Sequence, residues 1–304
     1  MLVDSAQIMS KAIHVVVGAR PNQMKAAPLL RVLRSSEEFT PFLVDTGQHY
    51  DHEMAGIFFE QFGMGTPDIS LNVGSGSHGK QTANILERYE AVLLEQKPDC
   101  VIVIGDVNST VACSLAATKL GIPTVHLEAG LRSNDRGMPE ELNRIVTDHL
   151  CDLLWTPSPD GDENLAKEGI AVEKVVRVGN IMIDTLVKME PLFRARNMKQ
   201  ELGIHRSHLV VTLHRPSNVD DESVLSLILA QLSTLADRHT LIWPIHPRTK
   251  SRIESYGLQS YIEHENIRCV PPLGYVEFMS LVASSNGVIT DSGGLQEETT
   301  YLGL

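Results

Sequence analysis

The stretch VIVIGDVNSTVACSLAATKLGIPTVHLEAGLRSNDRGMPEELNR, residues 101–144, decides the fold of this chain. Its first four residues are β-branched and apolar, which is typical of a strand buried on both faces of a parallel sheet. Residues 108–120 carry apolar side chains at helical spacing, and we expect Asn108 or Ser109 to cap that helix. A second apolar run follows at residues 124–127. The stretch therefore predicts a strand, a helix and a neighbouring parallel strand.

A carboxylate follows each of these two strands, Asp106 after the first and Glu128 after the second. Ligands of open α/β sheets bind at the carboxyl ends of the strands, so we expect the two acids to share a site with Glu140, at the start of the next helix. Two arginines are expected beside the three acids, namely Arg132 and Arg144. The alternative is that Asp106 caps a helix and that both glutamates are solvated.

Strand and helix patterns alternate on both sides of this stretch and begin again in the second half of the chain. This alternation predicts the α/β class, with doubly wound, largely parallel sheets. We place an N-terminal Rossmann-like domain at residues 1–180 and a second at residues 181–304. The helical pattern of residues 181–200 is expected to break near Pro191.

Composition narrows the class of protein. The 304 residues carry a net charge of −12, which argues against a basic nucleic-acid-binding face. No apolar run is long enough to span a membrane, and the N-terminus does not read as a signal peptide, so a cytoplasmic protein is expected. The four cysteines are scattered and His49 and His52 lack a third ligand at suitable spacing, so we expect no metal site and no disulfide framework.

Two patterns are typical of phosphate binding. Arg20 and Lys25 lie at the start of a predicted helix, where backbone N–H groups and the helix dipole favour an anion. Ser292, Gly293 and Gly294 follow the last predicted strand and could form a diphosphate cradle, with Glu298 one turn later to accept ribose hydroxyls. The alternatives are solvated bases at the first position and a simple helix cap at the second.

Two histidines, His214 and His246, each close a predicted strand and are soon followed by an arginine. They predict a phosphate-facing wall, although each could be a structural histidine. Residues 74–79, GSGSHG, match the spacing of a dinucleotide fingerprint but follow a polar loop and not a strand, so we expect no dinucleotide cofactor.

Seven motifs occur in one order: GARP…K, GDVNST, HLEAGLRS, MPEELNR, VTLHRPSN, HPR and DSGGLQEET. Together, over about residues 12–304, they closely resemble the non-hydrolysing UDP-N-acetylglucosamine 2-epimerases. The resemblance implies two Rossmann-like domains in the GT-B arrangement and a homodimer that interconverts UDP-GlcNAc and UDP-ManNAc. It also implies that no NAD or other cofactor, and no metal, is needed.

The resemblance also assigns site residues by motif position. Catalytic roles fall to Asp106, Glu128, Glu140 and His214. Contacts to UDP fall to Arg20, Lys25, His214, Leu273, Phe278, Ser292, Gly293, Gly294 and Glu298. A second, regulatory UDP-GlcNAc site in bacterial members corresponds to Gln48, His49, Gln81, Arg215 and His246.

Two departures from the family pattern matter. Pro216, Asp51 and Lys80 differ from the residues of regulated members, which predicts weak or absent regulation by substrate. The chain ends at Leu304, several dozen residues before the usual end of the family, so the second domain is expected to be incomplete. Four rival functions remain open: a GT-B glycosyltransferase, a hydrolysing epimerase, a non-catalytic nucleotide-sugar-binding fragment, and an epimerase of a UDP-diacetamido-uronate.

Overall fold

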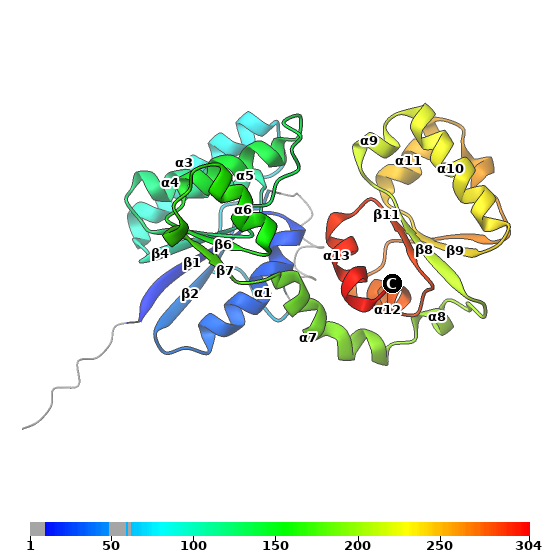
Figure 1. Ribbon diagram of the computed structural model, residues 1–304, viewed down its shortest axis with the longest axis horizontal. Helices are drawn as coiled ribbons and strands as arrows, with labels where there is room; N and C mark the ends of the chain where they lie inside the picture. The colour runs from blue at the N-terminus through cyan, green and yellow to red at the C-terminus, as the bar shows by residue number, and fades with distance from the viewer. Residues whose placement is uncertain (1–9, 49–58, 60–61) are drawn as a thin grey trace, which may run out of the picture. The chain divides into compact units, whose positions relative to one another are not determined.

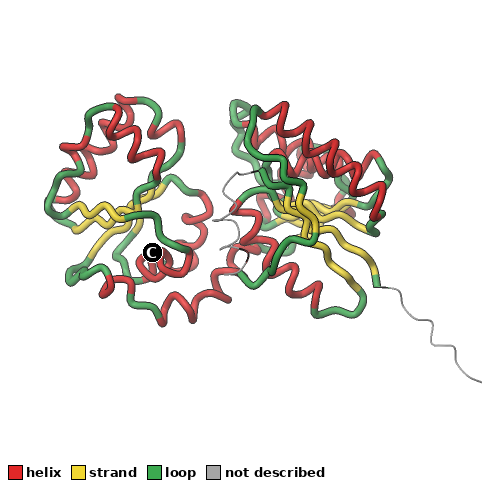
Figure 2. Tube along the Cα trace, turned by 180° about the vertical axis from the view of Figure 1, so that it is seen from behind, coloured by secondary structure: helices red, strands yellow, loops and turns green. Residues whose placement is uncertain are grey.

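The computed structural model describes residues 10–48, 59 and 62–304, with only the backbone described for Arg20 and Pro21. Contacts divide the chain into two compact units, Met1–Thr185 and Leu186–Leu304. Each unit has its own sheet, in which every described strand pair is parallel, with helices on both faces (Figures 1 and 2). The predicted α/β class with two Rossmann-like, doubly wound units is confirmed.

The first unit has a seven-stranded sheet in the order β3-β2-β1-β4-β5-β6-β7. The order runs one way from β1 to β3 and the other way from β4 to β7, as in a Rossmann fold. Its strands are β1 (Lys11–Val17), β2 (Phe39–Asp45), β3 (Ile69–Ser70), β4 (Cys100–Ile104), β5 (Thr124–Leu127), β6 (Leu153–Thr156) and β7 (Val175–Arg177). Its helices are α1 (Arg20–Arg34), α3 (His78–Gln96), α4 (Asn108–Lys119), α5 (Pro139–Leu150) and α6 (Pro159–Lys167), with a 3-10 turn at Val172–Lys174.

The core of this unit explains why the 101–144 stretch is so apolar. Val101 and Val103 of β4 are fully buried, and they share one hydrophobic cluster with the small side chains of α4. Ala112 and Ala116 of that helix are also buried, and small side chains let a helix pack close to a sheet and to its neighbours. The buried face of α4 therefore sets the position of the turn that joins it to β4.

The second unit has a four-stranded sheet in the order β10-β9-β8-β11. Its core gathers apolar residues of β8, β9 and α10, including the fully buried Trp243. The strands are β8 (His208–Thr212), β9 (Thr240–Pro244), β10 (Ile267–Val270) and β11 (Val288–Thr290). The helices are α8 (Met198–Glu201), α9 (Pro216–Val219), α10 (Glu222–Ala236), α11 (Pro247–Ser255), α12 (Tyr275–Ala283) and α13 (Gly293–Leu302), with a 3-10 turn at Gln259–Tyr261. Among the described residues, no helix has the length and apolar character needed to cross a membrane.

Two local predictions are wrong. The N-cap of α4 is Val107, because the side chains of Asn108 and Ser109 bond to other elements and not to the helix backbone. Helix α7 (Ile181–Ala195) runs through Pro191 without ending there. The break falls instead at Asn197, whose side chain accepts a hydrogen bond from the backbone N–H of Gln200 and caps the short helix α8.

Candidate active site

The strand order of each sheet reverses at one place, between β1 and β4 in the first unit and between β8 and β11 in the second. In open α/β sheets this reversal point is where ligands bind, outside the carboxyl ends of the strands. Asp106 follows β4, and Ser292 follows β11. The residues predicted for the sugar and for the nucleotide therefore lie at the reversal points of two different sheets.

Glu128 is held in an unusual backbone conformation next to a cation. Its φ of 77° lies in the left-handed region, which costs a non-glycine residue about 1–2 kcal/mol. Its carboxylate pairs with the Nζ of Lys25, and both side chains are largely buried. A Cβ added at Gly105, the residue before Asp106, would lie 3.5 Å from Glu128 Oε2. The geometry therefore brings Lys25, Glu128 and the Asp106 turn together.

Asp106 is tied to helix α5. Its carboxylate pairs with Arg144, and its backbone carbonyl accepts a hydrogen bond of 3.0 Å from the Asn143 amide. The expected position of Arg144 beside Asp106 is confirmed.

The two neighbouring glutamates at the start of α5 differ in their surroundings. Glu141 is buried and accepts hydrogen bonds of 2.9 Å from the backbone N–H groups of Ser133 and Asn134. Burial alone would raise the pKa of Glu141, but these hydrogen bonds and Arg144 lower it. Glu140 is half-buried, and within the described part of the chain its carboxylate has no partner. Glu140 is thus free to act on a ligand, whereas Glu141, which sequence reasoning missed, shapes the loop before the helix.

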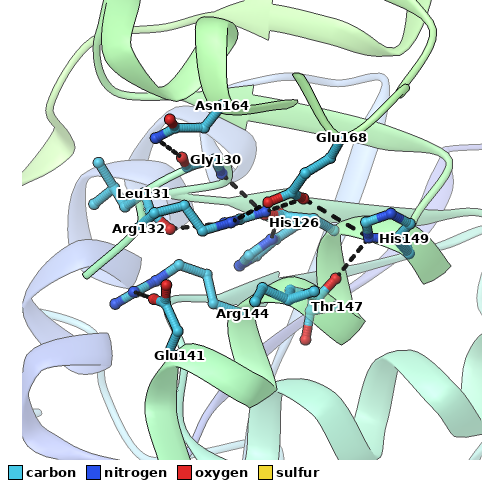
Figure 3. Close-up of polar contacts among 12 residues, drawn as sticks. His126, Gly130, Leu131, Arg132, Glu141, Arg144, Thr147, His149, Asn164 and Glu168 are labelled. Carbon is cyan, nitrogen blue, oxygen red and sulfur yellow. Dashed lines mark hydrogen bonds and ion pairs between the residues drawn. The ribbon is translucent and has the colours of Figure 1, made fainter. Parts of the chain in front are cut away.

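The expectation that Arg132 lies beside the three acids is wrong. Its guanidinium makes two bonds of 2.7 Å to the carboxylate of Glu168 and a third, of 2.8 Å, to Asp148. Figure 3 shows Arg132 pointing toward Glu168, while Arg144 lies against Glu141 in a separate pair. The motif contains two arginines at similar distances from the acids, and only packing decides which one faces them.

The glutamines assigned to a regulatory site take part in internal hydrogen bonds. Gln48 Oε1 accepts from the backbone and the hydroxyl of Ser109, and the Gln81 amide donates to two backbone carbonyls. Asn108 in turn donates to Gln81 Oε1 at 2.8 Å. His49 and the side chain of Arg20 lie outside the described residues.

The second unit contains a cavity of about 160 Å³ at the carboxyl ends of its strands. This volume is below the roughly 300–1,000 Å³ of pockets for drug-sized ligands, so it can take one part of a nucleotide sugar. The rings of His214 and His246 lie 5.9 Å apart at its edge. The lining residues are Thr212, Leu213, His214, Pro244, His246, Pro272, Leu273 and Phe278.

Asp291 orients this edge, and sequence reasoning missed it. One carboxylate oxygen accepts hydrogen bonds from the backbone N–H groups of His214 and Arg215, and the other lies 2.8 Å from His214 Nδ1. Burial alone would raise the pKa of Asp291, but these hydrogen bonds lower it, so the group stays ionised. The position was visible in the sequence as the first letter of DSGG.

The Ser292–Gly294 turn begins helix α13, and Ser292 caps it by accepting a hydrogen bond from the backbone N–H of Leu295. The guanidinium of Arg215, assigned above to a regulatory site, lies 3.8 Å from the position that a Cβ at Gly293 would take. A turn with glycine backbone, a helix N-terminus and a nearby guanidinium is suited to an anion.

Glu298 lies one turn into the same helix and is buried. It accepts a hydrogen bond of 2.7 Å from the hydroxyl of Tyr275. Burial raises the pKa of Glu298 to about 7, although the bond from Tyr275 acts in the opposite direction. A carboxyl group that changes charge near neutral pH therefore lies just behind the glycine turn.

The remaining candidate groups form no further site in the described part of the chain. No three His, Cys, Asp or Glu side chains of residues 10–48, 59 and 62–304 lie together as metal ligands would. All four cysteines are free thiols, and burial raises the pKa of Cys100 to about 11 and that of Cys151 to about 12. Such thiols are protonated at neutral pH and are poor nucleophiles.

The fold and the site thus define a class of protein: a pair of Rossmann-like units, one with carboxylates and one with a glycine turn suited to a phosphate, at their sheet reversal points. Residues 31–304 match the family model described as UDP-N-acetylglucosamine 2-epimerase. The chain belongs to the UDP-N-acetylglucosamine 2-epimerase family.

Three known proteins illustrate the match. The UDP-N-acetylglucosamine 2-epimerase of Methanococcus maripaludis is 40% identical over 96% of this chain and 81% of its own length. The UDP-2,3-diacetamido-2,3-dideoxy-D-glucuronate 2-epimerase of Pseudomonas aeruginosa is 38% identical over the same shares. A crystal structure of the Methanocaldococcus jannaschii UDP-GlcNAc 2-epimerase, in complex with UDP-GlcNAc and UDP, has a TM-score of 0.86 at 37% identity, over 96% of this chain and 82% of that one.

Proposed function

We propose that this chain interconverts UDP-GlcNAc and UDP-ManNAc at C2 of the sugar, without hydrolysis. No carbonyl lies beside C2, so its proton is not acidic and direct removal is unfavourable. Expelling UDP from C1 together with the C2 proton leaves 2-acetamidoglucal, and UDP then adds back after a proton returns on the opposite face. Asp106 and Glu128 follow the neighbouring strands β4 and β5, and Glu140 lies at the start of α5; this placement supports the proposal most strongly.

The proposed roles follow from the charges that develop in this reaction. The departing diphosphate gains negative charge, which Arg20, Lys25, His214 and the Ser292–Gly294 backbone are suited to stabilise. The three carboxylates serve the sugar, where they stabilise positive charge at C1 and carry the C2 proton. Leu273 and Phe278 line the apolar side of the cavity and are proposed to contact the uracil ring.

Deuterium exchange tests the proposal. Incubation with UDP-GlcNAc in deuterated water, followed by NMR, should place solvent deuterium at C2 of both epimers. The proton leaves C2 during the glucal stage, so the reaction cannot reach equilibrium without exchange.

Three other outcomes are distinguishable in the same spectra. Free ManNAc would show the hydrolysing reaction, and transfer to an acceptor without exchange at C2 would show a glycosyltransferase. Binding with neither product would favour a nucleotide-sugar-binding role without catalysis. Each would contradict the proposal.

The sugar itself has a second candidate. The Pseudomonas relative is named for a UDP-diacetamido-glucuronate, and its identity to this chain is close to that of the Methanococcus enzyme. We therefore propose that both sugars be compared under one exchange assay, with the larger kcat/KM identifying the substrate. We also propose that the protein is a cytoplasmic homodimer, and light scattering tests the dimer. Regulation by substrate is proposed to be weak or absent, so initial rates plotted against UDP-GlcNAc should be hyperbolic.

Glu298 is expected to contribute directly to nucleotide binding. Replacing Glu298 with alanine should weaken UDP binding by about 1–3 kcal/mol, the usual effect of losing a charged hydrogen bond. Calorimetric titration measures this, with Glu297→Ala as the control because that neighbouring side chain is exposed. Equal losses in the two variants would remove Glu298 from the site.

The raised pKa of Glu298 also predicts a pH dependence. The ionised carboxylate accepts ribose hydroxyls, so affinity should fall about tenfold between pH 8 and pH 6, given a pKa of about 7. UDP-GlcNAc is the suitable ligand, because both its phosphates are esterified and do not titrate in this range. Glu298→Gln should abolish the part of the pH dependence of affinity that comes from Glu298. Identical pH profiles for the variant and the wild type would contradict this role of Glu298.

The same raised pKa stabilises the folded protein at low pH, whereas it weakens nucleotide binding there. The folded protein holds the Glu298 proton more tightly than the unfolded chain does. This contribution to stability is present below the ordinary pKa of glutamate and is lost as the pH rises through about 7.

A further inference from the structure

A buried network of charges lies behind the turns that carry Asp106 and Glu128. His126 Nδ1 is 2.6 Å from Asp148 Oδ1, and both side chains are fully buried. Asp148 also pairs with Arg132, which is 4% exposed and bonds on to Glu168. Figure 3 shows His126 and Arg132 side by side, with Gly130 directed at the same cluster. Neither His126 nor Asp148 belongs to the proposed catalytic set.

The hydrogen bonds determine the protons on His126. Its Nε2 lies 2.7 Å from the backbone carbonyl of Gly105, which can only accept, so Nε2 carries a proton. Asp148 also accepts from Arg132 and from the backbone N–H of Gly130. Burial alone would raise the pKa of Asp148, but the contact with His126 and then the one with Arg132 lower it. An ionised carboxylate can only accept as well, so Nδ1 carries the second proton.

Charge balance supports the same form. With His126 as an imidazolium, the four groups His126, Arg132, Asp148 and Glu168 balance to zero charge. His149, half-exposed and 4.0 Å from Glu168, adds charge only when it is protonated. With a neutral His126 ring the four groups would hold one uncompensated negative charge in a largely buried place, which is unfavourable.

The network bonds to the backbone on both sides of the proposed catalytic acids. The Gly105 carbonyl directly precedes Asp106, and the Gly130 N–H lies two residues after Glu128. His126 itself lies two residues before Glu128. Because Glu128 has a strained φ of 77°, its backbone needs support from its surroundings to keep that conformation.

We propose that His126, as an imidazolium, and Asp148 are positioning residues that hold the backbone of Asp106 and Glu128 so that both carboxylates face the sugar. Neither residue touches the substrate. The inference rests on the proposed function, because it assumes that those two acids carry the reaction.

The first test is a separation of kcat from binding. Asp148→Asn and His126→Gln should lower kcat by about 10–100-fold, since a displacement near 1 Å can cost that much. UDP affinity should stay within about twofold, because the proposed nucleotide contacts lie largely in the other unit. Asp152→Asn is the matched control, because Asp152 bonds to Thr124 at the opposite end of β5. Rates are expressed per folded molecule, so that lost stability alone leaves kcat unchanged.

The second test uses the wild-type protein and needs no turnover. Proton–nitrogen correlation NMR at pH 7.5 should show both ring nitrogens of His126 protonated, with the signal assigned by its absence in His126→Gln. An unprotonated ring nitrogen, or unchanged kcat in both variants, would overturn the inference. If the wild-type protein exchanges no deuterium at C2, the proposed function fails. Two NMR observations then test the positioning role without turnover. They are the protonation of the His126 ring and the displacement of the Asp106 and Glu128 amide signals in Asp148→Asn.

Discussion

Replacing Asp106 with asparagine, or Glu128 or Glu140 with glutamine, is expected to lower turnover by roughly 10²–10⁴-fold, the usual range for losing acid–base catalysis. Each amide keeps the size of the side chain and removes its charge and its proton-accepting ability. UDP binding should remain largely intact, because these side chains are proposed to act on the sugar. The loss should therefore appear in kcat, with little change in the dissociation constant of UDP.

The ion pairs refine this expectation. Glu128 pairs with Lys25, which is itself assigned to the diphosphate, so Glu128→Gln releases Lys25 for the phosphate. The UDP affinity of the Glu128→Gln variant should therefore not fall below that of the wild type. Glu163→Gln is a suitable control, since that exposed carboxylate on α6 pairs, among the described residues, only with Lys167. Near-normal turnover in all three amide variants would remove this stretch from the catalytic centre.

Gly130→Ala is expected to destabilise the protein by about 2–5 kcal/mol, from about 1–2 kcal/mol of left-handed backbone strain and about 1–3 kcal/mol of overpacking. Gly130 has a φ of +80°, and an added Cβ would lie 2.4 Å from the backbone oxygen of Gly161. The contact is with backbone at the start of α6, which cannot rotate away as a flexible side chain would. The segment that carries Glu128 would have to move, so activity should fall as well.

Gly169→Ala separates the two causes. Gly169 has the same φ of +80°, but an added Cβ there meets no atom of the described residues within 4 Å. Its loss should be only the strain of about 1–2 kcal/mol. Urea unfolding of both variants measures the difference, and equal losses would mean that the approach of Gly130 to Gly161 is not tight in solution.

The sequence was sufficient for the α/β class and for the strand, helix and strand of residues 101–127. Runs such as residues 101–104 are apolar because both faces of a central parallel strand are covered, and this shows in the local composition. Acids and glycines directly after those strands could be assigned to one sheet edge, because the carboxyl ends of parallel strands lie at the same edge. The position of Glu298, six residues or more than one and a half turns after Ser292, follows from helical spacing alone.

Local rules were insufficient where a side chain had a distant partner. Asn108 and Ser109 are good caps by propensity, yet they bond to Gln81 and Gln48 from other elements. Pro191 removes one hydrogen bond from α7, but the helix continues and the fully buried Phe193 lies beyond it. In both cases tertiary contacts outweighed a preference worth about 1–3 kcal/mol.

The sequence by itself thus determined which residues follow which strands, because the period of apolar residues and the turn residues are local properties. Only the tertiary structure decided which charges meet. Lys25 pairs with Glu128 across 103 positions of sequence, and His214 meets Asp291 across 77. Arg144, and not Arg132, faces Asp106, and Glu141, and not Glu140, is bound to the loop. Such pairings depend on the packing of several helices and strands at once, and no spacing within one segment encodes them.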